Sequence, residues 1–131
     1  MGFLEAVLGD PGGEVVYVKT DEADVAEVCC DVSQLLRPEV AEAFRALGIG
    51  TLFKHQYDAV QSIRAGRDTV IVAGTGMGKT EAFLAPILEE ALESLGGPLA
   101  LVLYPTKALA RDQLGRFRKF ADRLGVRVMT Y

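Results

Sequence analysis

The sequence predicts an α/β fold in which a parallel sheet is joined by crossover helices. Continuous apolar runs at residues 69–73 and 99–104 are the main reason, because strands buried on both faces of a parallel sheet need such runs. With a third strand-like segment near the end of the chain, three strands are expected. They span residues 68–73, 99–104 and 126–131, and segments with helical spacing lie between them near 78–94 and 106–123. Strand, helix and strand in this order predict parallel pairing through crossover connections.

Length and composition fit one globular domain, since 131 residues include 50% hydrophobic and 24% charged residues. No apolar run approaches the ~20 residues that a membrane-spanning helix needs, and the first residues lack a basic leader. We therefore expect a cytoplasmic protein with no membrane partner. Cys29 and Cys30 are adjacent, which suits neither a disulfide nor a zinc site, so ordinary reduced thiols are expected.

The chain divides into a short N-terminal lead-in, residues 1–37, and a main domain, residues 38–131. In the lead-in we expect a short apolar helix, a turn at Asp10–Gly13 and a strand-like run from Glu14 to Lys19.

Two helices are expected at the start of the main domain. Pro38 suits a first helical turn, and Gly48 is a typical stop for the helix that follows. The second helix is expected from about Lys54 to Ala65.

Charge is unevenly placed along the chain, whose net charge is −4. Residues 1–42 hold ten acids and two bases, a balance of −8, whereas residues 107–131 hold seven bases and two acids, a balance of +5. A basic stripe on one element can follow phosphates although the whole chain is acidic. Basic helix faces are more often simply solvated, so charge alone does not decide between the two.

A glycine-rich loop follows the first apolar run and precedes a helix, which is the context of a phosphate-binding loop. Its residues are Ala73, Gly74, Thr75, Gly76, Met77, Gly78, Lys79 and Thr80. The glycines allow backbone N–H groups to point at one anion, and the helix adds its positive N-terminal end. Lys79 would contact the β- and γ-phosphates of ATP, and Thr80 would coordinate Mg²⁺, so these two are the candidate catalytic residues.

Two further blocks flank this loop. The first is Leu52-Phe53-Lys54-His55-Gln56, and the last is Tyr104-Pro105-Thr106-Lys107-Ala108-Leu109-Ala110-Arg111-Asp112-Gln113. In this order the three blocks resemble superfamily 2 helicases of the DEAD/DEAH-type branch, which includes RecQ-like enzymes and large helicases with a C-terminal cysteine cluster. The resemblance covers roughly residues 38–131 and implies a partial RecA-like P-loop domain, the first motor domain of such enzymes.

The resemblance implies roles for the flanking residues. Gln56 would read adenine, because its amide can donate and accept at once, and Phe53 or His55 could lie against the base. For His55, a capping or half-buried structural role is the favoured alternative.

The last block is similar to the helicase motif that holds the backbone of one nucleic-acid strand. A strand end, a threonine able to cap a helix and a lysine meet at one point there. The residues expected to contact single-stranded DNA or RNA are Pro105, Thr106, Lys107, Arg111 and Gln113.

ATP hydrolysis in the family also needs an acidic pair after a later strand and an arginine from a second motor domain. Asp21-Glu22-Ala23-Asp24 resembles the acidic motif in its letters, but it precedes the phosphate loop, so we reject it. We expect nucleotide binding without turnover, completion by the remainder of the motor in cis or trans, and possible self-association through an unfinished sheet.

Two other functions stay open. A small P-loop kinase would share the phosphate loop but would leave Gln56 and the Pro105-Thr106-Lys107 block without a purpose. A non-catalytic interaction module would use the acidic N-terminal segment to recruit a partner, and its loop would be vestigial. Measured ATP binding separates the interaction module from the other two.

Overall fold

The structure is a computed structural model that describes residues 27–96 and 99–131. Its elements, in chain order, are β1 (Val28–Asp31), the 3-10 turn η1 (Val32–Gln34), α2 (Pro38–Ala46), β2 (Thr51–Phe53), α3 (Lys54–Arg64), α4 (Lys79–Glu93) and α5 (Lys107–Leu124). The helix, turn and strand expected before residue 20, and the acidic Asp21–Asp24 segment, lie outside the described residues.

The helices form where their start and stop signals predict. Pro38 occupies the first turn of α2, where a missing N–H costs nothing. Thr106 caps α5, because its hydroxyl accepts a hydrogen bond from the Leu109 N–H at 3.2 Å. Gly125 ends α5 in the left-handed conformation, with φ of 68°.

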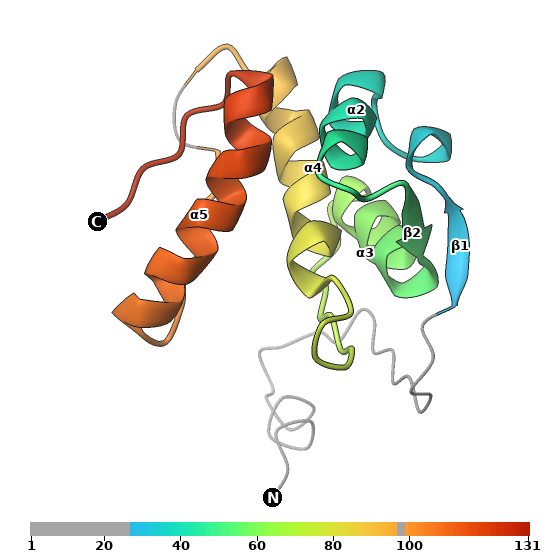
Figure 1. Cartoon of the computed structure of the whole chain (residues 1–131), viewed down its shortest axis with the longest axis horizontal. Coiled ribbons are helices and arrows are strands. Elements are labelled where there is room, and N and C mark those ends of the chain that lie inside the picture. The colour runs from blue at the N-terminus through green and yellow to red at the C-terminus, as the bar shows by residue number, and fades with distance from the viewer. Residues whose placement is uncertain (1–26, 97–98) are drawn as a thin grey trace, which may run out of the picture.

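The core lies where α4 packs between α5 and the group formed by α2, α3 and the small sheet (Figure 1). Aromatic pairs join these helices: the rings of Phe44 and Phe120 are 4.9 Å apart, and those of Phe83 and Phe117 are 6.1 Å apart. The cluster of buried side chains consists of Val32, Leu36, Val40, Ala41, Phe44, Leu52, Val60, Leu84, Ala85, Leu88, Phe117 and Phe120. This core fixes α3 and α5 on different sides of α4.

The strands β1 and β2 pair antiparallel, with Cys30 opposite Leu52. The sequence analysis did not predict this pairing. It is extended by a hydrogen bond from the Lys54 N–H to the Glu27 carbonyl at 2.8 Å, which holds the start of α3 against β1. Val32 and Leu36, from the predicted lead-in, are buried in the core. The domain boundary at residue 37 stays a prediction.

The parallel sheet expected from residues 68–73, 99–104 and 126–131 does not form within the described parts of the chain. The sheet found there has two strands, β1 and β2. Several apolar side chains of the three runs are exposed, with Leu101 at 79% and Leu103 at 80%. A continuous apolar run indicates that a segment needs neighbours on both faces. It does not indicate that nearby residues of the same chain provide them, and here the covering is incomplete.

None of the described helices is both long and apolar enough to span a bilayer. Cys29 and Cys30 are free thiols, as expected. Burial raises the pKa of the Cys30 thiol, and the neighbouring Cys29 raises it further.

Candidate nucleotide site and strand-contacting helix

The glycine-rich loop ends directly at the N-terminus of α4. Gly76 and Gly78 have φ of 78° and 71°, a region that favours glycine. A hydrogen bond from the Met77 N–H to the Gly74 carbonyl, at 3.3 Å, closes the turn. No side chain of residues 27–96 or 99–131 caps α4, so its first N–H groups are available to an anion.

Two buried side chains of helix α3 hold the loop in place. Gln56 donates from Nε2 to the Gly78 carbonyl at 3.0 Å and accepts from the Phe53 N–H at 2.9 Å. The His55 Nε2 lies 2.7 Å from the Met77 carbonyl oxygen. The Phe53 and His55 rings stack with centroids 5.6 Å apart. Two successive loop carbonyls are therefore fixed by two successive residues of one helix.

Gly78 shows how closely α3 approaches the loop. A Cβ at this position would overlap the amide nitrogen of Gln56 and lie 3.4 Å from Oε2 of Glu81. A Cβ here would have to displace the Gln56 side-chain amide, so glycine is favoured by space as well as by φ. The glycine thus lets the Gln56 amide reach the Gly78 carbonyl. A glycine-rich loop before a helix N-terminus is the arrangement that binds the phosphates of a nucleoside triphosphate.

Lys79 and Thr80 lie at the start of α4, where the first contacts the loop and the second contacts α5. Lys79 donates from Nζ to the Ala73 carbonyl at 2.7 Å, so it spans the mouth of the loop. An ammonium carries three donors, which leaves two for phosphate oxygens. The Thr80 hydroxyl donates to Oε1 of Gln113 on α5 at 3.2 Å.

Glu81 is the next residue of α4 and is 3% exposed. Its Oε1 accepts hydrogen bonds from Arg116 on α5, from Nε at 2.8 Å and from the second guanidinium nitrogen. Its Oε2 and the hydroxyl of Tyr104 are buried, and neither has a hydrogen-bond partner among the described residues. Burial raises the pKa of Tyr104, and the positive charge of Arg116 opposes part of that rise.

The predicted strand-contacting residues are mostly exposed around the start of α5. Thr106 acts as the helix cap, and Pro105, Lys107 and Arg111 have exposed side chains. Gln113 differs from these four, because its amide lies between Thr80 and Asp112, 3.1 Å from Oδ2 of the latter. The structure thus brings Gln113 to the nucleotide side of the site.

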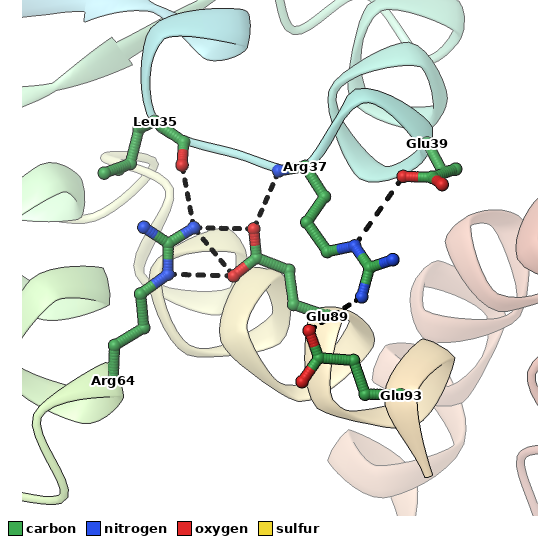
Figure 2. A network of polar contacts seen from close by, with 6 residues as sticks. All are labelled: Leu35, Arg37, Glu39, Arg64, Glu89 and Glu93. Carbon is green, nitrogen blue, oxygen red and sulfur yellow. Dashed lines mark hydrogen bonds and ion pairs between the residues drawn. The ribbon is translucent and has the colours of Figure 1, made fainter. Parts of the chain in front are cut away.

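Farther along α4, a polar network joins α3, α4 and the start of α2 (Figure 2). Glu89 accepts from the guanidinium of Arg64 at 2.6–2.9 Å and from the Arg37 N–H at 2.8 Å. Arg64 also donates to the Leu35 carbonyl at 2.7 Å, and Arg37 pairs with exposed Glu93 at 2.9 Å. The network sets the position of α3, which carries Gln56, against the phosphate-loop helix.

Two contributors to the site, Glu81 and Arg116, were not predicted from the sequence, and His55 was named for another role. His55 was favoured as a capping or half-buried residue, and its contact with the loop carbonyl was not foreseen. Arg116 was counted with the basic residues of the last segment, although its guanidinium turns inward to Glu81. The sequence offered one signal for this contact. Glu81 is an acid in the first turn of the helix that follows the phosphate loop, so a basic partner such as Arg116 could have been sought for it.

A glycine-rich loop that enters a helix through Lys79 and Thr80 defines the P-loop class of proteins. Within that class, the model of the DEAD/DEAH box helicase family matches residues 53–131. The matched segment covers more than half of the 131 residues. The chain belongs to the DEAD/DEAH box helicase family.

Several helicases are similar in sequence. An uncharacterized ATP-dependent helicase, YprA of Bacillus subtilis, is 34% identical over 92 residues, covering 70% of this chain and 12% of YprA. The Druantia protein DruE of Escherichia coli is 42% identical over 109 residues, covering 69% of this chain and 6% of DruE. Human DDX46, a probable ATP-dependent RNA helicase, is 36% identical over 94 residues, 62% of this chain and 9% of DDX46. The chain thus spans a small part of the length of these relatives.

A solved structure of the DUF1998 helicase MrfA, bound to DNA and AMPPNP, matches with a TM-score of 0.70 and 30% identity. The match covers 81% of this chain and 15% of the MrfA chain. It confirms the predicted fold class, a partial RecA-like P-loop domain, although the apolar runs of this chain are not paired into a parallel sheet.

Proposed function

We propose that this chain is the ATP-binding and strand-contacting part of an ATP-dependent nucleic-acid helicase. The observation that carries the proposal is the support of the phosphate loop by α3. Gln56 and His55 hold the carbonyls of Gly78 and Met77 at 3.0 and 2.7 Å. Because α3 holds these carbonyls, the loop N–H groups and the start of α4 are left for the phosphates of ATP.

Lys79 and Thr80 serve the triphosphate and its metal ion. Bound Mg²⁺ supplies charge neutralisation at the β- and γ-phosphates. Thr80 offers a hydroxyl oxygen, and its proton has an acceptor in Gln113 at 3.2 Å, so a lone pair stays available for the metal. Lys79 would donate to phosphate oxygens with the two N–H groups that its bond to the Ala73 carbonyl leaves.

Gln56 keeps enough capacity to read adenine while it supports the loop. A carboxamide has two N–H donors and two acceptor lone pairs. One donor goes to the Gly78 carbonyl and one lone pair to the Phe53 N–H. The remaining donor and lone pair match the acceptor and donor on one edge of adenine, with Phe53 or His55 beside the base.

The start of α5 contacts a single strand of nucleic acid. Exposed Lys107 and Arg111 supply positive charge, and Pro105 and Thr106 shape the helix start. Phosphate contacts of this kind position a strand without reading its sequence. The solved structure of MrfA holds DNA, and DDX46 is a probable RNA helicase, so DNA and RNA are both tested as ligands.

Residues 1–131 by themselves bind ATP without turning it over. The acid beside Thr80, Glu81, is buried and paired with Arg116, so it does not orient an attacking water. Hydrolysis in this class further needs an arginine that stabilises the transition state, which in related systems contributes about 10³–10⁵ in rate. The remainder of the motor, in cis or in trans, supplies these groups.

Titration with ATP and Mg²⁺ tests the proposal directly. Charge-assisted hydrogen bonds contribute about 1.5–3 kcal/mol, so Lys79→Ala should weaken binding by about ten- to a hundredfold. Lys119→Ala, on an exposed position of α5, is the matched control and should leave the affinity unchanged. Equal affinities in the unaltered chain and in Lys79→Ala would refute the assignment.

A further inference from the structure

Two adjacent residues at the start of α4 are tied to two residues on one face of α5. Thr80 donates to Gln113 at 3.2 Å, and Glu81 accepts from Arg116 at 2.8 Å. Gln113 and Arg116 are three positions apart, which places them on the same face of their helix. The last residue of the phosphate loop and its successor are thereby linked to the helix that starts with the strand-contacting residues.

The ion pair between Glu81 and Arg116 is weak evidence for stabilisation of the fold. Glu81 is 3% exposed, whereas the Arg116 side chain is 48% exposed. Taking a carboxylate out of water is offset only partly by one partner, and replacing such pairs by apolar residues is often neutral or stabilising. Oε2 of Glu81 has no hydrogen-bond partner within residues 27–96 and 99–131, and a buried acceptor without a partner is unfavourable. Because this buried ion pair is expected to stabilise the fold little, we assign Glu81 and Arg116 a positioning role.

Glu81 is also in contact range of the loop itself. Its Oε2 lies 3.4 Å from the point where a Cβ of Gly78 would stand, in the same small space as the Gln56 amide. An unpaired carboxylate here would repel the phosphates of a nucleotide, and Arg116 neutralises it. We expect a shift of the loop on anion binding to move Glu81, and Arg116 links Glu81 to α5.

We propose that Glu81, Gln113 and Arg116 are positioning residues that couple the phosphate loop to the strand-contacting start of α5. The inference rests on the proposed function, because both ligands must bind before they can be coupled. Filling the phosphate loop fixes Thr80 and Glu81, and their bonds then hold α5 in one position. The strand meets a helix that is already ordered, so each ligand raises the affinity for the other.

The coupling is measured as the ratio of two affinities. Fluorescence anisotropy of a labelled single-stranded DNA gives its affinity for the 131-residue chain with and without Mg²⁺ and the nonhydrolysable analogue AMPPNP. We expect a ratio of about 5–10 in the unaltered chain, within the usual range of coupling between sites. By linkage, the DNA must raise the AMPPNP affinity by the same factor, which a separate nucleotide titration checks.

Three substitutions break the connection in different ways. Glu81→Gln and Arg116→Gln remove the ion pair, and Gln113→Leu removes the neutral bond without unpairing a buried charge. We expect the ratio to fall to about 1 in the first two and to about half its original value in the third. The double substitution Glu81→Gln with Arg116→Gln should lose no more coupling than either single one, because the two act through one contact.

Glu89→Gln is the matched control. Like Glu81, Glu89 is a buried acid on α4 paired with an arginine of a neighbouring helix, but it lies two turns away from the loop. It should lower thermal stability and leave the ratio unchanged. Circular dichroism checks that each variant folds. If an ion-pair variant does not fold, the affinity ratio of Gln113→Leu tests the inference.

The outcomes separate the inference from the function on which it rests. A ratio that persists in folded Arg116→Gln and Gln113→Leu overturns the inference, and so does a ratio near 1 in an unaltered chain that binds both ligands. In those cases the proposed function stands. If the unaltered chain binds neither AMPPNP nor DNA, both fail together. Loss of the ratio in Glu89→Gln as well would show general loosening and would also overturn the inference.

Discussion

Among single residues, Gln56 and Gly78 make the closest contact between α3 and the phosphate loop. Gln56 was selected from the sequence as an adenine reader, and the structure adds a second task, since its Nε2 holds the Gly78 carbonyl at 3.0 Å. The glycine makes this approach possible, because its missing Cβ leaves the space that the Gln56 amide occupies. The adenine-reading role stays a prediction, and the loop-holding role is visible in the contacts.

Gly78→Ala should therefore weaken nucleotide binding as well as lower stability, because a Cβ would displace the Gln56 amide from the loop. Gly66→Ala is the control, because Gly66 has nearly the same φ, 72° against 71°, but open space around it. Both substitutions force alanine into the left-handed region at a cost of about 1–2 kcal/mol. Thermal unfolding and ATP titration on both variants separate the two effects. Retained ATP binding in Gly78→Ala would contradict the close packing described for the loop.

At the scale of elements, the helices were predictable and the sheet was not. Pro38, Thr106 and Gly125 mark helix ends through local chemistry, so their positions follow from sequence alone. The pairing of β1 with β2 depends on residues 32–50 folding back between the strands, and no local pattern specifies that. The contact between Glu81 and Arg116 joins positions far apart in sequence, and charged residues of both types are usually exposed.

The polar network of Figure 2 predicts an unequal response from two acids of α4. The side chain of Glu89 is 10% exposed and binds Arg64, whereas that of Glu93 is 66% exposed and binds Arg37. Glu89→Gln should destabilise the fold by about 1–3 kcal/mol, because it weakens a charge-assisted network. Glu93→Gln should change stability by less than about 0.5 kcal/mol, as for most exposed pairs. Chemical denaturation of both variants measures this, and equal losses would show that the network does not hold α3 against α4.

For the whole molecule, the exposed apolar runs predict self-association. Leu101 and Leu103 are 79% and 80% exposed in a segment without strand partners among the described residues. Such surfaces tend to pair with another chain. Light scattering should show a mass that rises with concentration, and Leu101→Lys with Leu103→Lys should suppress the rise. Leu95→Lys, at an exposed site outside the runs, should not suppress it. A monomer at every concentration would contradict the prediction.

We expect the loop from Ala73 to Thr80, which α3 holds, to be the nucleotide-binding site of this helicase-family chain. The most direct measurement is nuclear magnetic resonance of the ¹⁵N-labelled chain during titration with Mg²⁺ and AMPPNP. We predict that the largest shifts fall on the backbone amides of Gly74, Gly76 and Gly78 and on the side-chain amide of Gln56. Absent shifts, or shifts centred away from the loop and α3, would show that the nucleotide does not bind at this loop.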